Sequence, residues 1–388
     1  MSFSVLLINS WRVVGAKGGT EKVFCTLANA LSKRGFAVTM LCCDANRGET
    51  GFPVDEKVRF LNVGERESRI ERFFCKLKSF SFDSKVRKRK REFCKIERLA
   101  RLFGKSVEII EQSDVVISFQ PETTYLLYEC LRVKTPVISM FHHDPRVYFS
   151  ETLFFPYYRD ALLKCCTLQV LRPEYVDALH KIGAKEVVYI PNGCPKCDQQ
   201  KDLSARKIVC VGRINIKQKR MDLLLRSFSL IKDDFPDWCV EIWGERDLNS
   251  SDTKYLLNLC GTLDLEGRVF FKGVTDNIES VLRESSIFAM PSAYEGFPLA
   301  LIEAMMVGIP AVGCLDCPGV NTVIENEVNG LLVQPEPKSF SEGLVALMKS
   351  EEIRLVYGQG ARNTALYFDS EKVWDSWGEL IGQVAKSQ

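Results

Sequence analysis

The sequence predicts an α/β protein built from two doubly wound domains, each a parallel sheet with helices on both faces. Three observations lead to this prediction. The chain has 388 residues, more than one hydrophobic core usually supports. Short runs that are apolar throughout alternate with longer helical patterns, as expected of strands buried on both faces. This alternation occurs twice, on either side of a polar segment at 195–207, which we predict to be a linker.

The first half contains six apolar runs that we predict to be strands. They lie at 5–9, 37–43, 58–63, 114–119, 136–141 and 187–192. Between the first two, TEKVFCTLANALSKRG has the spacing of an amphipathic helix and ends at Gly35, a residue that commonly closes helices. A long basic stretch runs from Arg69 to Lys105. We predict residues 1–194 to be the N-terminal domain.

The second half repeats this rhythm, with helical patterns between six further apolar runs. The predicted strands lie at 207–212, 239–244, 268–273, 286–292, 310–314 and 330–335. We predict residues 208–366 to be the C-terminal domain. Ligands of doubly wound sheets bind at the carboxyl ends of the strands, so we expect a site in a cleft between two facing Rossmann-like domains.

Composition limits the classes of protein that the chain can belong to. A net charge of +2 argues against a surface built wholly for nucleic acid. The fifteen cysteines are odd in number and often lie in apolar runs, which favours reduced thiols. The N-terminus lacks a basic start, and the longest apolar stretch, near 298–315, is interrupted by polar and helix-breaking residues. We therefore expect a cytoplasmic protein without a signal peptide or a transmembrane helix.

The segment SAYEGFPLALIE places Glu295 and Glu303 around a Gly-Phe-Pro turn that opens an apolar helix. Pro298 suits the first turn of a helix, which puts Glu295 in the preceding loop and Glu303 on the second turn. The free N–H groups and partial positive charge of a helix N-terminus can hold a phosphate. A carboxylate nearby can accept hydrogen bonds from a vicinal diol, so the pair suits a sugar nucleotide.

The spacing alone also fits a charge at a helix start and a solvated helical residue. Two cations nearby favour the interpretation of this segment as a binding site. Arg213 directly follows an apolar strand and Lys219 stands shortly before the next helix, so both can meet a diphosphate. Any single Arg or Lys is more often an ordinary surface cation.

Two loops in the first half supply weaker candidates. Gly18 and Gly19 lie between the first strand and the first helix and would let a backbone approach a ligand, although a plain βα turn fits as well. His142 and His143 follow a strand without metal-site spacing or a companion cysteine. They predict polar contacts in the cleft rather than a metal site, and a structural histidine remains equally compatible.

Together these segments resemble the GT-B fold glycosyltransferases of the large family four, which are retaining enzymes that use nucleotide-sugar donors. The paired glutamates of that family, with seven residues between them, match Glu295 and Glu303. Its Arg and Lys match Arg213 and, with one extra residue in the loop, Lys219. The family histidine most resembles His142, and GGTE and IPNG also match. The resemblance covers nearly the whole chain.

The resemblance implies a role for each matching residue. Glu303 would bind the ribose, Glu295 the donor sugar, and Arg213 with Lys219 the diphosphate leaving group. His142 would contact the donor near the reacting centre. The predicted catalytic residues are therefore His142, Glu295, Arg213 and Lys219. The remaining predicted donor contacts are Gly18, Gly19, Gly296, Phe297, Pro298, Leu299 and Glu303.

The resemblance also implies catalysis without a metal or other cofactor, because cations and helix-terminal N–H groups can stabilise the departing diphosphate. No protein nucleophile is assigned. The chain departs from the family at Glu245 and Arg246, where many members have a second glycine, and at His143, where an asparagine is common. The helix at 367–388 would pack back on the N-terminal domain.

The stretch from Lys85 to Lys105 has ten basic residues against two glutamates, with an apolar stripe at helical spacing that contains Phe93, Ile96, Ala100 and Phe103. This composition suits an interfacial helix on anionic lipid or a groove for a lipid diphosphate. We predict acceptor or membrane contacts at Lys88, Arg89, Arg91 and Lys95. A solvated helix whose stripe packs on its own sheet fits equally well. No nucleic-acid-binding module accompanies the cluster, so we predict no nucleic-acid partner.

The resemblance implies a retaining transferase that moves a hexose or N-acetylhexosamine from a nucleotide-sugar, expected to be UDP-linked. The expected acceptor is a lipid-linked oligosaccharide, a lipopolysaccharide, or a capsule or exopolysaccharide, reached from the inner face of the membrane. One alternative is a catalytically silent nucleotide-sugar-binding partner subunit, which the presence of both glutamates, Arg213 and Lys219 disfavours. Another is a sugar-nucleotide epimerase or hydrolase, which needs an acid and a base near the sugar.

Overall fold

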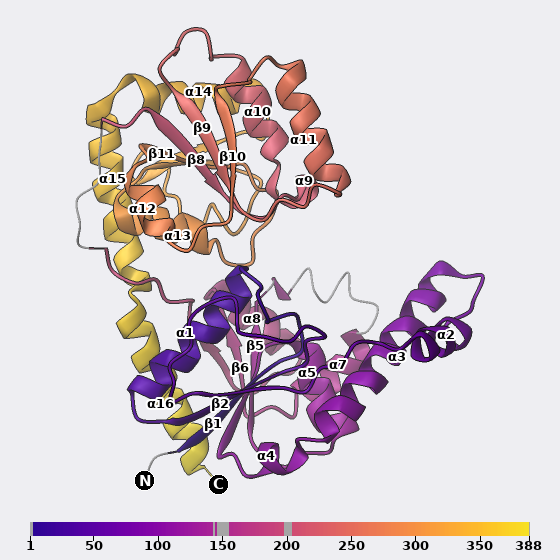
Figure 1. Ribbon diagram of the computed structural model, residues 1–388. Coiled ribbons are helices and arrows are strands. Elements are labelled where there is room, and N and C mark those ends of the chain that lie inside the picture. Colours follow the sequence, from indigo (N-terminus) through magenta and orange to yellow (C-terminus); the bar gives the residue numbers. More distant parts are fainter. Residues whose placement is uncertain (1–2, 143, 146–154, 198–203, 388) are drawn as a thin grey trace. The chain divides into compact units, whose positions relative to one another are not determined.

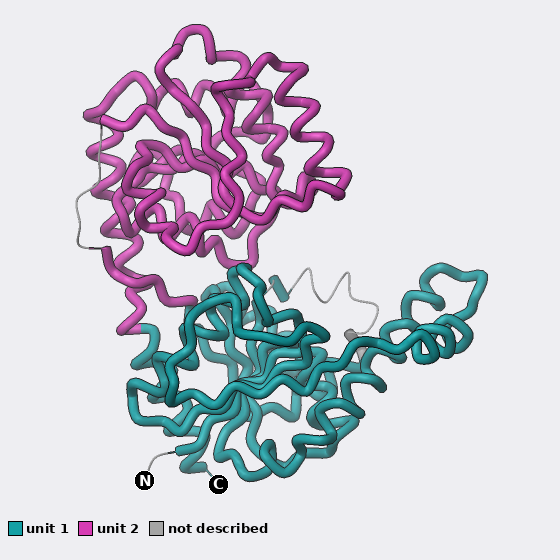
Figure 2. Tube along the Cα trace, viewed as in Figure 1, with its two compact units in different colours: residues 1–191, 373–388 teal, residues 192–372 magenta. Residues whose placement is uncertain are grey.

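The computed structural model describes residues 3–142, 144–145, 155–197 and 204–387. The chain forms two compact units (Figure 2). Unit 1 comprises residues 1–191 and 373–388, and unit 2 comprises residues 192–372. Residues 198–203 of the predicted linker lie outside the described residues. The two units together give the predicted α/β class with two doubly wound sheets, which is confirmed.

Unit 1 contains a seven-stranded sheet in the order β3-β2-β1-β4-β5-β6-β7, and every neighbouring pair is parallel. The strands are β1 Ser4–Asn9, β2 Ala37–Cys42, β3 Arg59–Asn62, β4 Val115–Ser118, β5 Val137–Phe141, β6 Thr167–Val170 and β7 Val187–Tyr189. Strand order reverses between β1 and β4, which makes their carboxyl ends the switch point where ligands of such sheets bind. All six strands predicted in this half are present, and β6 is additional.

Helices cover both faces of the unit 1 sheet (Figure 1). The helices of unit 1 are α1 Gly19–Lys33, α2 Arg69–Lys78, α3 Ser84–Gly104, α4 Val107–Glu111, α5 Pro121–Tyr125, η1 Leu126–Cys130, α7 Phe155–Leu162, α8 Glu174–Lys181 and α16 Ser370–Lys386, of which α2 does not lie on the sheet. Successive side chains of β1 point to opposite faces. Leu7 packs in a core cluster with α1 and α16, whereas Leu6 and Ile8 pack in another with the end of α3. Trp377 of α16 is 2% exposed in the first cluster, so the C-terminal helix completes a core made by the N-terminal half.

Unit 2 contains a six-stranded parallel sheet in the order β10-β9-β8-β11-β12-β13. Its strands are β8 Lys207–Val211, β9 Cys239–Trp243, β10 Val269–Gly273, β11 Ile287–Met290, β12 Ala311–Cys314 and β13 Gly330–Val333. Each lies where the sequence predicts one. The reversal of order falls between β8 and β11, which are the strands that precede Arg213 and Glu295.

The unit 2 helices also lie on both faces of their sheet (Figure 1). They are α9 Ile216–Lys219, α10 Met221–Ser229, α11 Ser251–Thr262, α12 Ile278–Arg283, α13 Leu299–Val307, α14 Pro337–Lys349, α15 Glu351–Ala365 and the short η2 Leu366–Phe368. Ile208 and Cys210 pack in one core cluster, and Val209 between them packs in the other, which includes α13. Among the described residues, no helix combines the length and the apolar composition needed to cross a membrane.

Candidate active site

The switch point of the unit 2 sheet brings Lys219 and Glu295 together. Lys219 ends α9, which follows β8, and Glu295 stands in the loop after the adjacent strand β11. The Lys219 Nζ donates a hydrogen bond to Oε1 of Glu295 over 2.7 Å. The two side chains are only 17% and 7% exposed, so this is a largely desolvated ion pair. Two residues that are 76 positions apart thus meet at the edge where a ligand is expected.

The loop after β8 is shaped to present Lys219. Asn215 caps α9 by accepting a hydrogen bond from the Gln218 backbone N–H over 3.0 Å. A Cβ at Gly212 would lie only 3.0 Å from Cε of Lys219, so glycine at the strand end lets the lysine chain lie across it. Arg220 then adopts a left-handed conformation, with φ of 45°, which separates α9 from α10. The lysine is held by backbone geometry as well as by its charge.

The loop after β11 is anchored on both sides of Glu295. The backbone N–H of Ala293 donates to the Gln218 carbonyl oxygen over 2.8 Å, which joins this loop to α9. A Cβ at Gly319 would lie 2.3 Å from the backbone oxygen of Glu295, so only glycine permits that contact. Cys210 lies buried nearby, and burial raises the pKa of its thiol to about 12. The pair therefore stands in surroundings that strengthen electrostatic interactions.

Glu303 lies on the second turn of α13, where its side chain is partly buried. The sequence predicted Pro298 in the first turn of this helix. Its φ and ψ of −83° and 66° are not helical, so Pro298 instead occupies the cap position and the helix begins at Leu299. Pro298 supplies no side-chain hydrogen bond to the N-terminus of α13. Gly296 and Phe297 form the turn before it, and the Phe297 ring packs edge-on against Phe368 at 5.6 Å.

Arg213 is not part of the Lys219–Glu295 pair. Its side chain is exposed directly after β8 and Gly212. No ion pair links it to a carboxylate in the part of the chain that the structure describes. The loop that replaces the family's second glycine, Glu245 and Arg246, is also exposed. Arg213 is therefore a cation available to an anionic ligand at the edge of the unit 2 sheet.

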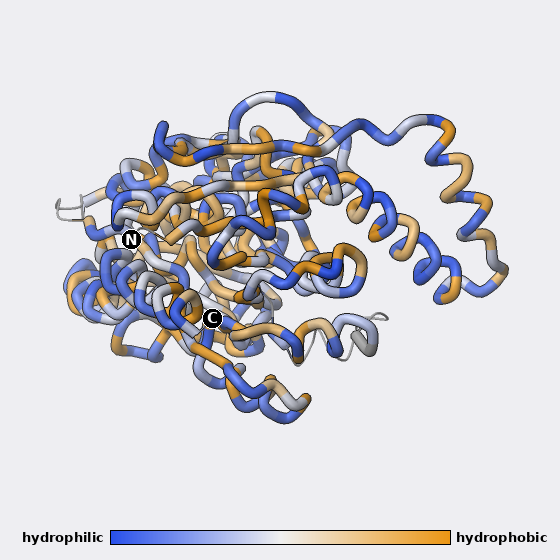
Figure 3. Tube along the Cα trace, turned by 90° about the horizontal axis from the view of Figure 1, so that it is seen from below, coloured by the Kyte–Doolittle hydropathy of each residue, from blue (hydrophilic) through white to orange (hydrophobic). Residues whose placement is uncertain are grey.

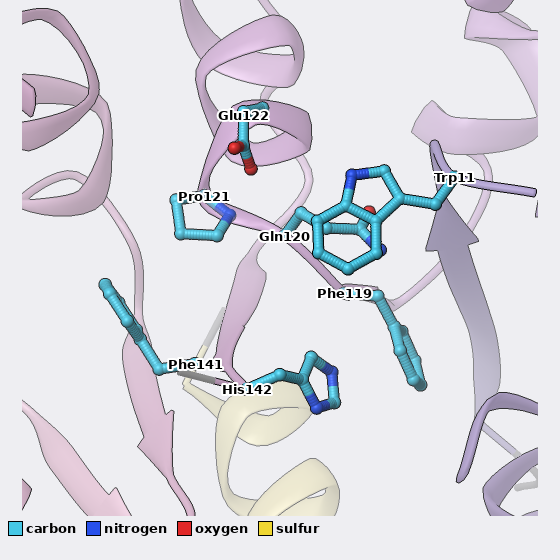
Figure 4. A pocket seen from close by; sticks show the side chains of 7 residues that line it. All are labelled: Trp11, Phe119, Gln120, Pro121, Glu122, Phe141 and His142. Carbon is cyan, nitrogen blue, oxygen red and sulfur yellow. The ribbon is translucent and has the colours of Figure 1, made fainter. Parts of the chain in front are cut away.

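Unit 1 has a pocket at its own switch point (Figure 4). Its lining residues lie at or after the carboxyl ends of the three adjacent strands β1, β4 and β5, and they are Trp11, Phe119, Gln120, Pro121, Glu122, Phe141 and His142. The imidazole of His142 stacks on the Phe119 ring, with 5.4 Å between ring centroids and 27° between planes. The structure thus places the predicted His142 in a pocket, although its neighbour His143 lies outside the described residues.

Gln120 ties the loops of this pocket together. Its Oε1 accepts a hydrogen bond from the Ser10 backbone N–H over 3.1 Å, and its Nε2 donates to Oδ1 of Asn9 over 2.7 Å. The loop after β1 is thereby fixed to the loop after β4. Gly18 is the cap residue of α1, where a Cβ would lie 2.1 Å from Oε2 of Glu21, and Gly19 is the first helical residue. Neither glycine lines the pocket.

Sequence reasoning missed Trp11, Gln120 and Glu122 as site residues. Their only signal is position, because each stands just after a predicted strand of a parallel sheet. That signal becomes informative only when β1 and β4 are known to be neighbours.

The predicted basic stretch forms part of an arm, residues 69–104, made of α2 and α3. Figures 1 and 3 show that α2 and the first half of α3 extend away from the sheet of unit 1. Ile96 and Phe103 of the predicted stripe are buried in the cores of unit 1. The stripe therefore packs on its own unit and is not a lipid-facing surface, which corrects the interfacial interpretation of that stripe.

Most exposed apolar residues of the arm lie instead in α2 and the turn after it, and Val86 at the start of α3 is 41% exposed. Those of α2 and this turn are Ile70, Phe73, Phe74, Leu77, Phe80 and Phe82, each between 53% and 95% exposed. The predicted contacts Lys88, Arg89, Arg91 and Lys95 are exposed on α3. The Cζ atom of Arg89 lies 4.8 Å from the centroid of the Tyr157 ring, and Nζ of Lys95 lies 3.6 Å from Oε1 of Glu92. Cationic and apolar surface thus occur together on the arm.

No cluster of three or more His, Cys, Asp or Glu side chains that could hold a metal ion occurs within the described ranges.

Two protein-family models match the chain, one for each half. The model described as Glycosyltransferase Family 4 matches residues 17–195. The model described as Glycosyl transferases group 1 matches residues 197–364. The two matches together leave only the ends of the chain and one position between them unmatched.

Relatives of known name are similar to the chain over nearly its full length. An uncharacterized glycosyltransferase from Haemophilus influenzae is 26% identical over 95% of this chain and 97% of the relative. The amylovoran biosynthesis glycosyltransferase AmsD from Erwinia amylovora is 25% identical over the same shares of the two chains. An α-1,4-N-acetyl-D-galactosaminyltransferase from Campylobacter jejuni, whose name gives an undecaprenol-diphosphate-linked acceptor, is 23% identical over 99% of this chain and 98% of the relative.

Solved structures share the fold at low sequence identity. The sucrose-phosphate synthase from Thermosynechococcus elongatus superimposes with a TM-score of 0.78 at 16% identity and covers 100% of both chains. TarM from S. aureus, solved with UDP and glycan ligands, superimposes with a TM-score of 0.76 at 14% identity and covers 98% of this chain and 99% of TarM.

Proposed function

Because this chain belongs to the GT-B glycosyltransferases of family 4, we propose that it transfers a hexose or N-acetylhexosamine, with retention, from a UDP-sugar to a glycan acceptor. The acceptor class that we propose is a lipid-linked oligosaccharide, a lipopolysaccharide, or a capsule or exopolysaccharide. The observation that carries the proposal is the Lys219–Glu295 pair at the switch point of the unit 2 sheet. It joins a cation and a hydroxyl-binding carboxylate at the edge where nucleotides bind in doubly wound sheets.

The charges at this edge suit a diphosphate leaving group. Lys219 and Glu295 offset one another, and Arg213 is an exposed cation directly after β8, the strand that neighbours β11. The N-terminus of α13, which follows the Glu295 loop, adds a partial positive charge. We propose that Arg213 and Lys219 stabilise the charge that develops on the departing diphosphate, without a metal ion. Glu295 keeps Lys219 in position and accepts hydrogen bonds from the sugar, while Glu303 binds the ribose.

The donor and acceptor classes draw support from the named relatives. TarM was solved with UDP, which supports a uridine nucleotide. AmsD is named as a glycosyltransferase of amylovoran biosynthesis, and the name of the Campylobacter transferase gives an oligosaccharide linked to undecaprenol diphosphate. Gly18, Gly19 and His142 in unit 1 remain predicted donor contacts.

Donor binding tests the proposal. We would titrate a panel of UDP-, GDP- and ADP-sugars into the protein by calorimetry with EDTA present throughout. We expect one UDP-sugar to bind. Glu303→Ala should lose that binding, because the variant lacks the carboxylate that accepts hydrogen bonds from the ribose. Glu342→Ala removes an exposed glutamate of α14 in the same unit and serves as the matched control.

The outcomes separate the alternatives. Binding that is absent with EDTA and appears in a second titration with Mg²⁺ in place of EDTA would contradict the metal-free proposal. Equal binding by Glu303→Ala and the control would contradict the assigned ribose contact. Donor binding without transfer to any glycan would favour a silent partner subunit, and release of free sugar or an isomerised donor would favour a hydrolase or an epimerase.

We also propose that the arm attaches the enzyme peripherally to an anionic membrane surface. Exposed aromatic and aliphatic side chains on α2 can enter the interfacial region of a bilayer. Basic side chains near an anionic surface each contribute about 1 kcal/mol. Both kinds of side chain lie on the arm, which supports contact between the arm and a lipid surface rather than exposure of the arm to water.

Sedimentation with vesicles tests the proposed attachment of the arm to a membrane. We expect the protein to bind vesicles that contain phosphatidylglycerol, to bind phosphatidylcholine vesicles weakly, and to dissociate as salt is added. Phe73→Ser combined with Phe74→Ser should reduce binding, whereas Leu248→Ser, which alters an exposed leucine of unit 2, should not. Equal binding to both vesicle types by all variants would contradict the proposal.

A further inference from the structure

Arg220 and Asp316 form an ion pair that spans the strand ends of unit 2. Nη1 of Arg220 donates to the two carboxylate oxygens of Asp316 over 2.9 and 2.8 Å. Arg220 follows α9 in the connection after β8, and Asp316 lies in the loop after β12. The strand between β8 and β12 in the sheet is β11, whose own loop carries Glu295. The ion pair therefore joins the two loops that flank the loop of Glu295.

The flanked loop contacts both of its neighbours. Toward α9, the backbone N–H of Ala293 donates to the Gln218 carbonyl oxygen over 2.8 Å. Toward β12, Gly319 approaches the backbone of Glu295 so closely that a Cβ would lie 2.3 Å from the Glu295 oxygen. With the ion pair, these two contacts make a closed ring through the loops after β8, β11 and β12.

Arg220 has a backbone conformation that glycine adopts more readily. Its φ and ψ are 45° and 42°, in the left-handed region, where a residue with a Cβ is less stable than glycine. The ion pair compensates little for this strain, because the two side chains are 30% and 40% exposed and exposed ion pairs contribute little to stability. A strained residue whose contacts stabilise the fold so little indicates a functional role.

The ring determines the spacing between Lys219 and Glu295. Lys219 directly precedes Arg220, and its Nζ lies 2.7 Å from Oε1 of Glu295. A shift of the β12 loop away from α9 would release the contact at Gly319 and let the Glu295 backbone move. Such a movement matters because binding sites lose affinity when their residues are displaced by about 1 Å.

We propose that Arg220 and Asp316 are positioning residues for the donor. Their ion pair holds the loops after β8 and β12 together and thereby keeps the Glu295 carboxylate where the sugar binds. They act through Glu295 and Lys219 rather than by contact with the donor. This inference rests on the proposed transferase function and adds the residues that support its donor site.

Calorimetry on the full chain tests this role. The probes are UDP-glucose, UDP-galactose, UDP-N-acetylglucosamine and UDP-N-acetylgalactosamine, with UDP alone for comparison. Arg220→Gly should bind the UDP-sugar that the unaltered protein prefers about fivefold or more weakly. The loss should be smaller for UDP, because UDP lacks the sugar that Glu295 holds. Arg220→Lys keeps a cation near Asp316 and should restore most of the affinity.

Asp264→Gly is the matched control for Arg220→Gly. Asp264 is also a left-handed residue other than glycine, with φ of 51°, and its carboxylate lies 2.9 Å from Nζ of Lys232. It precedes β10, whereas Arg220 follows β8, so the two residues lie at opposite edges of the parallel sheet. Asp264→Gly should bind the UDP-sugar as the unaltered protein does.

Thermal unfolding separates positioning from stabilisation of the fold. Both glycine variants relieve a left-handed residue and remove one ion pair, so they should unfold at similar temperatures. A clearly lower unfolding temperature for Arg220→Gly than for Asp264→Gly would show that the Arg220–Asp316 pair serves the stability of unit 2, and would overturn the inference.

Asp316→Ala distinguishes positioning from direct contact with the donor. If the ion pair positions the loops, Asp316→Ala should lose about as much affinity as Arg220→Gly, and the double variant should lose no more than either. If Arg220 instead bound the diphosphate itself, removal of Asp316 would free the cation. Affinity would then stay the same or rise, and the inference would be overturned.

The remaining outcomes distinguish this inference from the proposed function. If the unaltered protein binds a UDP-sugar and Arg220→Gly binds it equally well, the positioning role is overturned while the transferase proposal stands. The same holds if Arg220→Gly loses equal affinity for UDP and for the UDP-sugar. If the unaltered protein binds none of the four UDP-sugars, the proposed function fails and the positioning role fails with it.

Discussion

Glu295 and Glu122 both turn a carboxylate away from solvent, yet only Glu295 has a cation beside it. Lys219 lies 2.7 Å from Glu295, whereas the charges nearest to Glu122 act on it without contact. The first carboxylate is therefore coupled to the loop after the neighbouring strand, and removing either member leaves the other desolvated. For the second, burial is the largest influence on the carboxylate, and it raises the pKa of Glu122. The two residues predict different responses to substitution.

Lys219→Met should destabilise unit 2 by about 2–3 kcal/mol, because it leaves Glu295 largely buried without its partner. The double variant with Glu295→Gln should cost less than the sum of the two single changes, which denaturant unfolding can measure. Arg206 and Asp237 form an exposed pair in the same unit and provide the control, with a coupling expected at roughly 0–1 kcal/mol. Additive effects at Lys219 and Glu295 would mean that the pair does not form in solution.

The raised pKa of Glu122 predicts how the stability of unit 1 changes with pH. A group whose pKa is higher in the folded state binds more protons there, so stability is lost as pH rises through the folded pKa. Glu122→Gln should remove this loss. The unfolding temperature of the variant minus that of the unaltered protein should therefore be larger at about pH 7 than at about pH 4.

The groups that face Glu122 are unchanged in this comparison. They are Glu92 and Lys95 on α3, Tyr158 on α7, and Tyr125 and His142 near the pocket. Glu108→Gln, which makes the same change at an exposed glutamate of α4 in unit 1, should show no such trend. A difference that shrinks as pH rises would contradict the raised pKa.

The sequence identified Lys219 and Glu295 singly but could not predict their pairing. The pairing follows from the adjacency of β8 and β11, whose order is set by long-range packing. For Glu122 the only signal was its position just after a predicted strand, because the sequence does not show that Glu92 and Lys95 of α3 lie near it. Residue types at strand ends could thus be predicted, whereas burial and ion pairs could not.

At the scale of elements, α13 is closed by Gly308, which has φ of 88°. Gly308→Ala should destabilise unit 2 by about 1 kcal/mol, because an alanine rarely adopts that conformation. A Cβ there would lie 3.5 Å from the nearest atom, so the cost comes from backbone strain rather than from a clash. Denaturant unfolding measures the effect.

Gly261 provides the comparison for that prediction, because it lies within α11 of the same unit and has no positive φ. Gly261→Ala should leave stability unchanged or increase it, since alanine favours helix more than glycine does. Similar losses in both variants would contradict an explanation based on the backbone conformation of Gly308.

Strand prediction succeeded where a run was apolar throughout and failed at β6. That strand, TLQV, is four residues long and carries two polar side chains, so its apolar pattern is too short to distinguish it from a loop. Its place between β5 and β7 in the sheet makes it a strand. For α3 the difficulty was different. The helical spacing identified its apolar stripe, but it did not predict which residues cover that stripe.

At the scale of the whole molecule, α16 supplies unit 1 with core residues from the far end of the chain. Trp377→Ala should destabilise unit 1 by about 3–5 kcal/mol, because this side chain is fully enclosed in the cluster around β1 and α1. Hydrogen exchange should accelerate in peptides from β1 and α1 while peptides from β8 and β9 keep their protection.

Tyr367→Ala, at a residue that is 80% exposed, should change stability by no more than about 0.5 kcal/mol. Faster exchange in the unit 2 strands of Trp377→Ala would contradict the assignment of α16 to unit 1.

The return of α16 to unit 1 sets an order for folding on the ribosome. The first 191 residues emerge early, but their core lacks Trp374 and Trp377 until the whole of 192–372 has been made. At roughly 5–20 residues per second, that intervening unit takes on the order of 10–40 seconds to synthesise. Throughout that interval the nascent first half exposes the apolar face that α16 later covers. The half made first is therefore completed last, and it is the half that we expect to depend on chaperones during translation.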